Sequence, residues 1–166
     1  MRLSAMTDYA MRLLMYVGQH PDRLCTISEI AQAYGISQAH LMKITHRLAQ
    51  RGWITTVRGK NGGMRLALAP QDISLGAVVR DTENDLALVA CMAQGNRNQC
   101  TLTGQCGLKG IVQGALEHFM QHLDAYTLAD ILPRQLQTTS QRTVMGCERK
   151  VDITISSTLP STSEIT

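Results

Sequence analysis

The sequence predicts a mainly α-helical fold with one small β-hairpin and a long helix in its second half. Three observations support this fold class. Apolar residues recur at spacings of three and four in several stretches, which is the period of an amphipathic helix. An Asn-Gly pair at residues 61–62 separates two short β-branched or apolar runs, a strong hairpin signal. The widest apolar stripe covers residues 107–124 and needs a large partner surface.

Composition and charge limit the protein class. The 166 residues are 44% apolar, and no apolar run approaches the ~18 residues that span a membrane. The N-terminus has no apolar signal core, so we expect a cytoplasmic protein. Residues 1–72 hold nine Lys/Arg and four Asp/Glu (+5), residues 73–133 three and six (−3), and residues 134–166 four and three (+1). A basic first part favours nucleic-acid binding beside a separate sensing part.

The first predicted helix covers residues 3–17 and stops near Gly18. A second, short helix follows Thr26, which has capping-box spacing with Glu29. Gly35 permits a tight turn, and Ser37 is a good N-cap for a third helix, from Gln38 to Arg51. The third helix has a predicted buried face of Leu41, Ile44, Thr45 and Leu48, and an outer face of Ala39, Lys43, His46, Arg47 and Gln50.

These parts compose a helix-turn-helix, whose second helix enters the DNA major groove. The alternative is an ordinary helical hairpin with a solvated charged face. Residues 53–57 and 64–68 then predict two strands, joined by a loop that is rich in glycine and lysine or arginine. A hairpin after a recognition helix is a wing, and its cations suit phosphates and a narrow minor groove. The loop has no Gly-Lys-Ser/Thr, so it is not a P-loop.

The second half of the chain predicts three further helical pieces. Ser74 caps a short helix that runs from Leu75 to about Thr82, and residues 127–132 form a last short piece. The helix over residues 107–124 could pair with its copy in a second subunit, giving a two-fold dimer suited to palindromic DNA. Packing within the monomer is the alternative.

The chain is therefore divided into a winged helix-turn-helix part (1–72), a cysteine loop with a dimerisation helix (73–133) and a tail (134–166). The tail is rich in Ser, Thr and Gln, and we expect it to be flexible.

Three of the five cysteines, Cys91, Cys100 and Cys106, fall within sixteen residues. The spacing Cys-x8-Cys-x5-Cys is wider than the knuckles preferred by structural zinc. Iron–sulfur clusters are held by thiolates and accept wide spacings. Three thiolates leave one ligand to be supplied by Asp8, Cys25, a histidine, Cys147 or a second subunit. A metal-free thiol redox sensor and three unrelated thiols are the other interpretations. No nucleophile–base set is visible, so we do not expect an enzyme.

Ordered motifs along residues 1–133 resemble the iron–sulfur winged-helix transcriptional regulators. The motifs are Met1-Arg-Leu, Thr7-Asp-Tyr-Ala10, the helix-turn-helix from Ser28 to Arg51, Val57-Arg-Gly-Lys-Asn-Gly-Gly63 and the three-cysteine loop. The chain is most similar to the nitric-oxide-sensitive repressors of that family. Its cluster-assembly regulators place a histidine where this chain has Lys109. Its rhizobial iron regulators are similar around Cys91, which keeps an iron-responsive or cluster-status role open.

The resemblance implies a homodimeric repressor with a [2Fe–2S] or [4Fe–4S] cluster on Cys91, Cys100 and Cys106. It implies Asp8 of the other subunit as the fourth ligand, and nitric oxide as a signal that damages the cluster and releases DNA. Base contacts are expected from Gln38, Ala39, His40 and Lys43, with phosphate contact from Arg47. The remaining expected DNA contacts are Ser28, Ser37 and the wing residues Arg58, Lys60 and Arg65.

Overall fold

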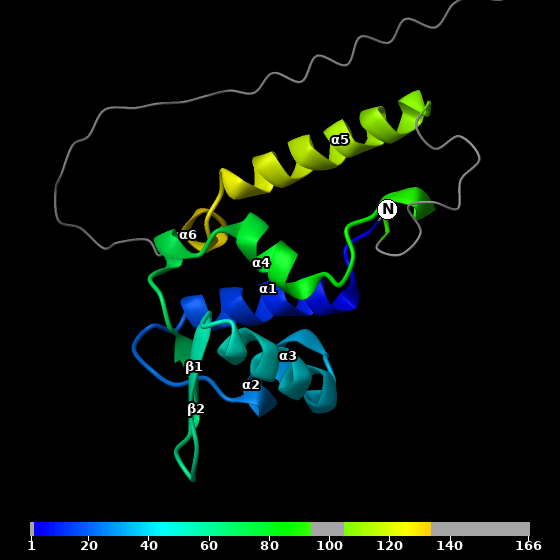
Figure 1. Cartoon of the computed structure of the whole chain (residues 1–166). Coiled ribbons are helices and arrows are strands. Elements are labelled where there is room, and N and C mark those ends of the chain that lie inside the picture. Colours follow the sequence, from blue (N-terminus) through cyan, green and yellow to red (C-terminus); the bar gives the residue numbers. More distant parts are fainter. Residues whose placement is uncertain (1, 94–104, 134–166) are drawn as a thin grey trace, which may run out of the picture. The chain divides into compact units, whose positions relative to one another are not determined.

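The computed structural model describes residues 2–93 and 105–133. The predicted tail, Cys100 and Cys147 lie outside these residues. The elements are α1 (Ala5–Gly18), α2 (Ile27–Tyr34), α3 (Gln38–Gln50), β1 (Ile54–Val57), β2 (Gly63–Leu66), η1 (Pro70–Asp72), α4 (Leu75–Thr82), η2 (Ala90–Met92), α5 (Gly107–Asp124) and α6 (Leu128–Ile131). The predicted fold class, mainly helical with one small hairpin, is confirmed (Figure 1). No helix in the described parts is long and apolar enough to cross a membrane.

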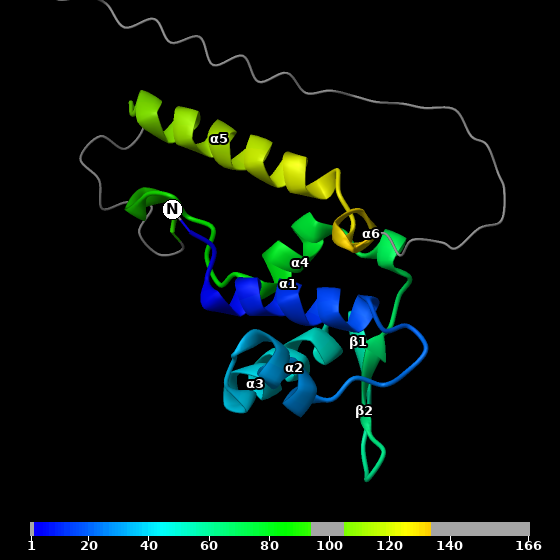
Figure 2. The ribbon, with the colours of Figure 1, turned by 180° about the vertical axis from the view of Figure 1, so that it is seen from behind.

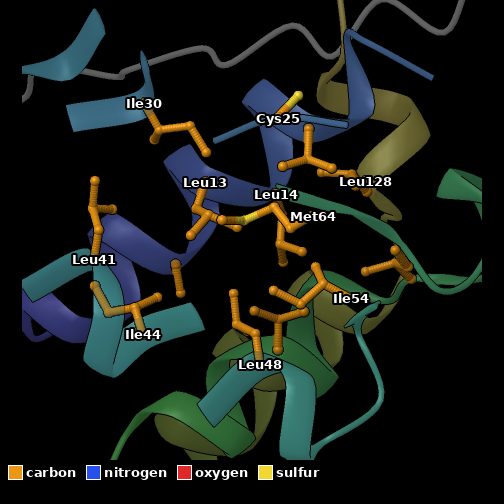
Figure 3. Packing of buried hydrophobic residues seen from close by; sticks show 14 of the residues in the cluster. Leu13, Leu14, Cys25, Ile30, Leu41, Ile44, Leu48, Ile54, Met64 and Leu128 are labelled. Carbon is orange, nitrogen blue, oxygen red and sulfur yellow. The ribbon is translucent and has the colours of Figure 1, made fainter. Parts of the chain in front are cut away.

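Helix α1 is the centre of the structure. It contacts α2, α3, α4, α6 and β2, and Figures 1 and 2 show it between the α2–α3 pair and α4. Its residues Leu13 and Leu14 are fully buried, and Figure 3 shows them meeting side chains from the other elements. Full burial of one such side chain stabilises the fold by about 1.5–3 kcal/mol. The winged helix-turn-helix part (residues 1–72), called here the reading head, is therefore built around the buried face of α1.

The turn between α2 and α3 forms as its residues predict. The Thr26 hydroxyl accepts a hydrogen bond from the Glu29 N–H, which caps α2. Gly35 has φ of 64°, a left-handed conformation that glycine adopts at no steric cost. The Ser37 hydroxyl accepts from the His40 N–H and starts α3. The predicted buried face of α3 is confirmed at all four positions.

The hairpin β1–β2 is antiparallel, with Ile54 opposite Leu66 and Val57 opposite Gly63. Its base is also tied to the loop before α2. Cys25 and Met64 exchange two backbone hydrogen bonds, of 2.9 and 2.8 Å. This second edge contact fixes the direction in which the wing leaves the core.

Residues 1–133 form one compact unit, and the core draws on both predicted parts of it. Leu128 of α6 is fully buried, and its N–H donates to the Ile73 carbonyl at 2.8 Å. Helix α5 packs along α4, but only Met120 of α5 is buried. The boundary predicted at residue 72 therefore crosses a shared core, and we keep it as a proposed division of roles.

Candidate functional site

The outer face of α3 presents polar and small side chains on a rigid helix. Gln38, Ala39, His40 and Lys43 are all exposed, while the opposite face packs into the core. Ser28 is exposed in the first turn of α2, and Ser37 is exposed at the cap of α3. Side chains at the N-terminal end of a recognition helix reach base edges, so this face is suited to major-groove contact.

Met42 is a residue that the sequence pattern did not assign to this face. Its side chain is 56% exposed, beside Lys43 on the surface of α3. An apolar side chain in the major groove can contact the methyl group of thymine. A methionine off the buried stripe of a predicted recognition helix was the available signal.

The wing carries three cations and no acidic residue between residues 53 and 68. Arg58 and Lys60 lie in the exposed turn, where Gly59 has φ of 113°. Arg65 lies within β2 rather than at the tip. Its guanidinium donates to the Thr55 hydroxyl across the hairpin at 3.4 Å. The turn therefore offers exposed cations for phosphate, while Arg65 is held along the strand.

Arg47 lies on one flank of α3 and is half-buried. Its guanidinium donates to the Asn84 side-chain oxygen at 3.1 Å. This partner follows the end of α4, 37 residues further along the chain. Periodicity placed Arg47 on an outer face but gave no indication of this contact.

Two of the three clustered cysteines are described, and each lies at a chain segment that borders the loop. Cys91 is in η2, and Cys106 is the N-cap of α5, where its side chain makes no capping hydrogen bond. Both are free and partly exposed. Soft thiolates on an accessible segment fit the donor chemistry of an iron–sulfur centre.

The candidate fourth ligand, Asp8, lies in the first turn of α1. Its carboxylate accepts a hydrogen bond from the Arg12 guanidinium and forms an ion pair with it at 3.1 Å. Both side chains are about half exposed. Within residues 2–93 and 105–133, no three potential ligands lie close enough to hold a metal ion. The Asp8 carboxylate is accessible at the surface, and an exposed ion pair such as the one with Arg12 contributes little to stability.

Cys25 has a different environment from the other described thiols. It is fully buried in the core, and this burial raises the pKa of its thiol to about 11. Its side chain packs inside the hydrophobic core, where no second ligand set can reach it, so we assign Cys25 a packing role.

The chain matches a family model described as Rrf2, "Iron-dependent Transcriptional regulator", over residues 3–134. This chain belongs to the Rrf2 family. Rrf2 proteins are transcriptional regulators, so the prediction that the chain is not an enzyme is confirmed.

Named relatives agree with this assignment. The chain is 48% identical over 133 residues to the HTH-type transcriptional regulator NsrR of Geobacillus kaustophilus, covering 80% of this chain and 90% of the relative. It is 43% identical to NsrR of Bacillus subtilis, with the same coverage. The predicted resemblance to this group is confirmed.

Solved structures show the same Rrf2 fold. IscR of T. potens superposes with a TM-score of 0.63 at 24% identity, covering 79% of this chain and 85% of that one. CymR, the global cysteine regulator of B. subtilis, superposes with a TM-score of 0.64 at 21% identity, covering 79% and 95%. At these identities the comparison establishes the winged-helix architecture alone.

Proposed function

We propose that this Rrf2 protein is a cytoplasmic, homodimeric repressor whose DNA binding depends on an iron–sulfur cluster and is released by nitric oxide. The observation that carries the proposal is the position of residues 83–106, called here the cysteine segment. In sequence they connect α4, which packs on α1, to α5, and they include two free, partly exposed thiols, Cys91 and Cys106. A change in that segment can therefore act on the head and on the dimer together.

The proposed ligands are Cys91, Cys100 and Cys106, with Asp8 of the second copy. When bound, an iron–sulfur cluster supplies iron that reacts with nitric oxide. A carboxylate oxygen is a hard donor among soft thiolates, so Asp8 would be the most easily replaced of the four ligands. DNA binding is strong while the four proposed ligands hold one cluster, and weak once loss of the cluster separates them.

Nitric oxide is the signal we propose because the relatives above carry the name of the nitric-oxide-sensitive group. An iron-responsive role is favoured by the family description and is the second candidate. A metal-free thiol regulator is the third, since Cys91 and Cys106 are free and accessible. Iron and sulfide analysis separates the third candidate from the others, and iron chelation against nitric-oxide exposure separates the first two.

Dimerisation is proposed through α5. Its apolar stripe is wider than α4 covers, and Leu108 and Ile111 are 60% and 72% exposed. A second α5 is self-complementary to such a stripe, and a two-fold dimer matches a palindromic operator. The operator is therefore expected to contain two half-sites separated by whole helical turns.

The decisive experiment compares the wild-type chain with Cys106→Ala and Cys25→Ala, all purified without oxygen. Wild type and Cys25→Ala are expected to contain iron and sulfide, absorb visible light and release DNA when nitric oxide is added. Cys106→Ala is expected to lose all three properties, since a ligand is gone while the core is intact. A wild-type protein free of iron and sulfide would contradict the cluster proposal.

Asp8 is tested by its spectrum. Asp8→Ala is expected to retain a cluster with altered visible absorption and circular dichroism, because one ligand is replaced by another donor. The matched control is Asp22→Ala, which removes an exposed carboxylate outside the helix. A spectrum of Asp8→Ala identical to that of wild type removes Asp8 from the site.

A further inference from the structure

Residues 81–84, called here the α4-end segment, form polar contacts with three separate parts of the reading head. Asp81 accepts a hydrogen bond from the Trp53 indole N–H at 2.9 Å and lies 3.6 Å from the Arg51 guanidinium. Both partners follow the recognition helix directly. The carboxylate of Asp81 therefore holds the junction between α3 and β1.

Glu83 holds the beginning of α1. Its carboxylate oxygen accepts from the Ser4 backbone N–H at 2.7 Å and from the Thr7 hydroxyl at 2.6 Å. The Thr7 hydroxyl also lies 2.9 Å from that of Thr82, and both threonines are buried. A carboxylate at a helix N-terminus is stabilised by the helix dipole. This contact fixes the helical turn that carries Asp8.

Asn84 makes the remaining contact, with Arg47 on α3. A guanidinium has five N–H donors, and this hydrogen bond uses one. The others remain available to a DNA phosphate. Arg47 can therefore bind Asn84 and phosphate at once, and each contact orients the same planar group for the other.

The residues after Asn84 lead directly to Cys91. The chain from 85 to 93 has little regular structure besides η2, so its course depends on how its ends are held. Within the described residues, the side chain of Asp85 accepts a local hydrogen bond, from the Ala87 N–H. Asn84 immediately precedes this stretch, and among the described contacts its bond from Arg47 is the hydrogen bond that ties the start of the stretch to the recognition helix.

We propose that Asn84 is the positioning residue that couples residues 85–93, which include Cys91, to DNA binding through its hydrogen bond with Arg47. This rests on the proposed function for the identity of the signal, but the coupling itself is a property of the chain. Coupling between two sites is reciprocal. DNA on Arg47 therefore orders residues 85–93, and disturbance of that stretch weakens DNA binding.

The first test uses the metal-free full-length chain, so it does not depend on the cluster. Amide hydrogen exchange over residues 85–93 is measured with and without saturating duplex DNA at low salt. DNA is expected to slow exchange in wild type and in Asp85→Ala, which removes the neighbouring, local contact. Asn84→Ala is expected to bind DNA without slowing exchange there, and Asn84→Asp to restore the effect by offering Arg47 a carboxylate. DNA-dependent slowing that persists in Asn84→Ala overturns the proposal.

The second test measures the ratio of DNA affinities of the cluster-loaded and metal-free protein. Asn84→Ala is expected to reduce that ratio by about fivefold, the lower end of typical coupling factors. Asp85→Ala should leave it unchanged. A wild-type ratio of one contradicts the proposed function while the first test still decides the role of Asn84. A wild-type ratio above one that Asn84→Ala leaves intact contradicts the coupling alone.

Discussion

At the scale of single residues, the thiols show how environment separates cysteines of one chain into different roles. Cys25 is fully buried against the wing, whereas Cys91 and Cys106 are partly exposed within the cysteine segment. Thiolate character governs ligation and oxidation. The core position of Cys25 makes it inert at neutral pH, and leaves the exposed thiols as the reactive ones.

Cys25 should make stability depend on alkaline pH. Burial raises the pKa of its thiol from 9.0 to about 11, so the folded chain retains a proton that the unfolded chain loses. The contribution of the protonated Cys25 thiol to the free energy of unfolding is complete below pH 9 and is lost as the pH rises toward 11. The difference between wild type and Cys25→Ala should fall by up to about 1.4 kcal/mol per pH unit in that window. Urea denaturation from pH 8 to 11 measures this. A constant difference between the two proteins contradicts it.

Residue-scale prediction from sequence succeeded where a side chain acts on its own helix and failed where its partner is distant. The caps Thr26 and Ser37 bond to backbone groups three residues away, a distance that sequence spacing reveals. Arg47 and Asn84 are 37 residues apart, and nothing in either neighbourhood specifies the pairing. Cys100, the central proposed ligand, lies outside the described residues and stays a prediction.

At the scale of elements, hydrophobic period and capping residues predicted the hairpin and, within residues 2–93 and 105–133, every helix of at least eight residues. These signals are local, so they survive without knowledge of the tertiary structure. The short elements η1 and η2 were not predicted, because three residues cannot display a period. The attachment of the wing to Cys25 was also missed, since it consists of backbone hydrogen bonds.

Helix α4 depends on a glycine where α5 crosses it. A Cβ at Gly76 would fall on the Asp124 carboxylate, which Arg80 holds with two hydrogen bonds of 2.6 Å. Gly76→Ala should therefore destabilise the fold by about 1–3 kcal/mol despite alanine's helix propensity. Gly110→Ala, in α5 with open space around it, should instead gain up to about 1 kcal/mol. Urea midpoints report both, and equal shifts in the same direction would refute the close packing of α4 on α5.

The wing is expected to contribute electrostatic affinity that carries no sequence information. Lys60→Ala removes an exposed cation from the hairpin turn. The slope of log K against log[salt] for DNA binding should become shallower by about 0.9, the value for one phosphate contact. Lys109→Ala on α5 is the control of equal charge and should keep the wild-type slope. If both variants change the slope alike, the effect is one of net charge and the wing makes no direct contact.

At the scale of the whole molecule, the exposed apolar residues of α5 predict a homodimer that forms through this helix. Ile111→Glu places a charge in the proposed dimer contact, whereas Gln121→Glu places the same charge on a polar, exposed position of the same helix. Ile111→Glu should raise the dimer dissociation constant by about tenfold or more, equivalent to ~1.4 kcal/mol. Sedimentation velocity over a concentration series measures it. Equal masses for the two variants at every concentration would argue against this face.

The packing of α4 against α5 has a consequence for how such a sensor can change over evolution. The two helices contact each other directly, with Arg80 of α4 bound to Asp124 at the far end of α5, so the fold itself fixes where each end of the intervening segment lies. Lengthening a closed loop costs only about 0.6 kcal/mol per doubling. The spacing and identity of the residues in that segment can therefore vary with little effect on folding, and one DNA-reading scaffold can acquire new chemical inputs by exchange of a single insert.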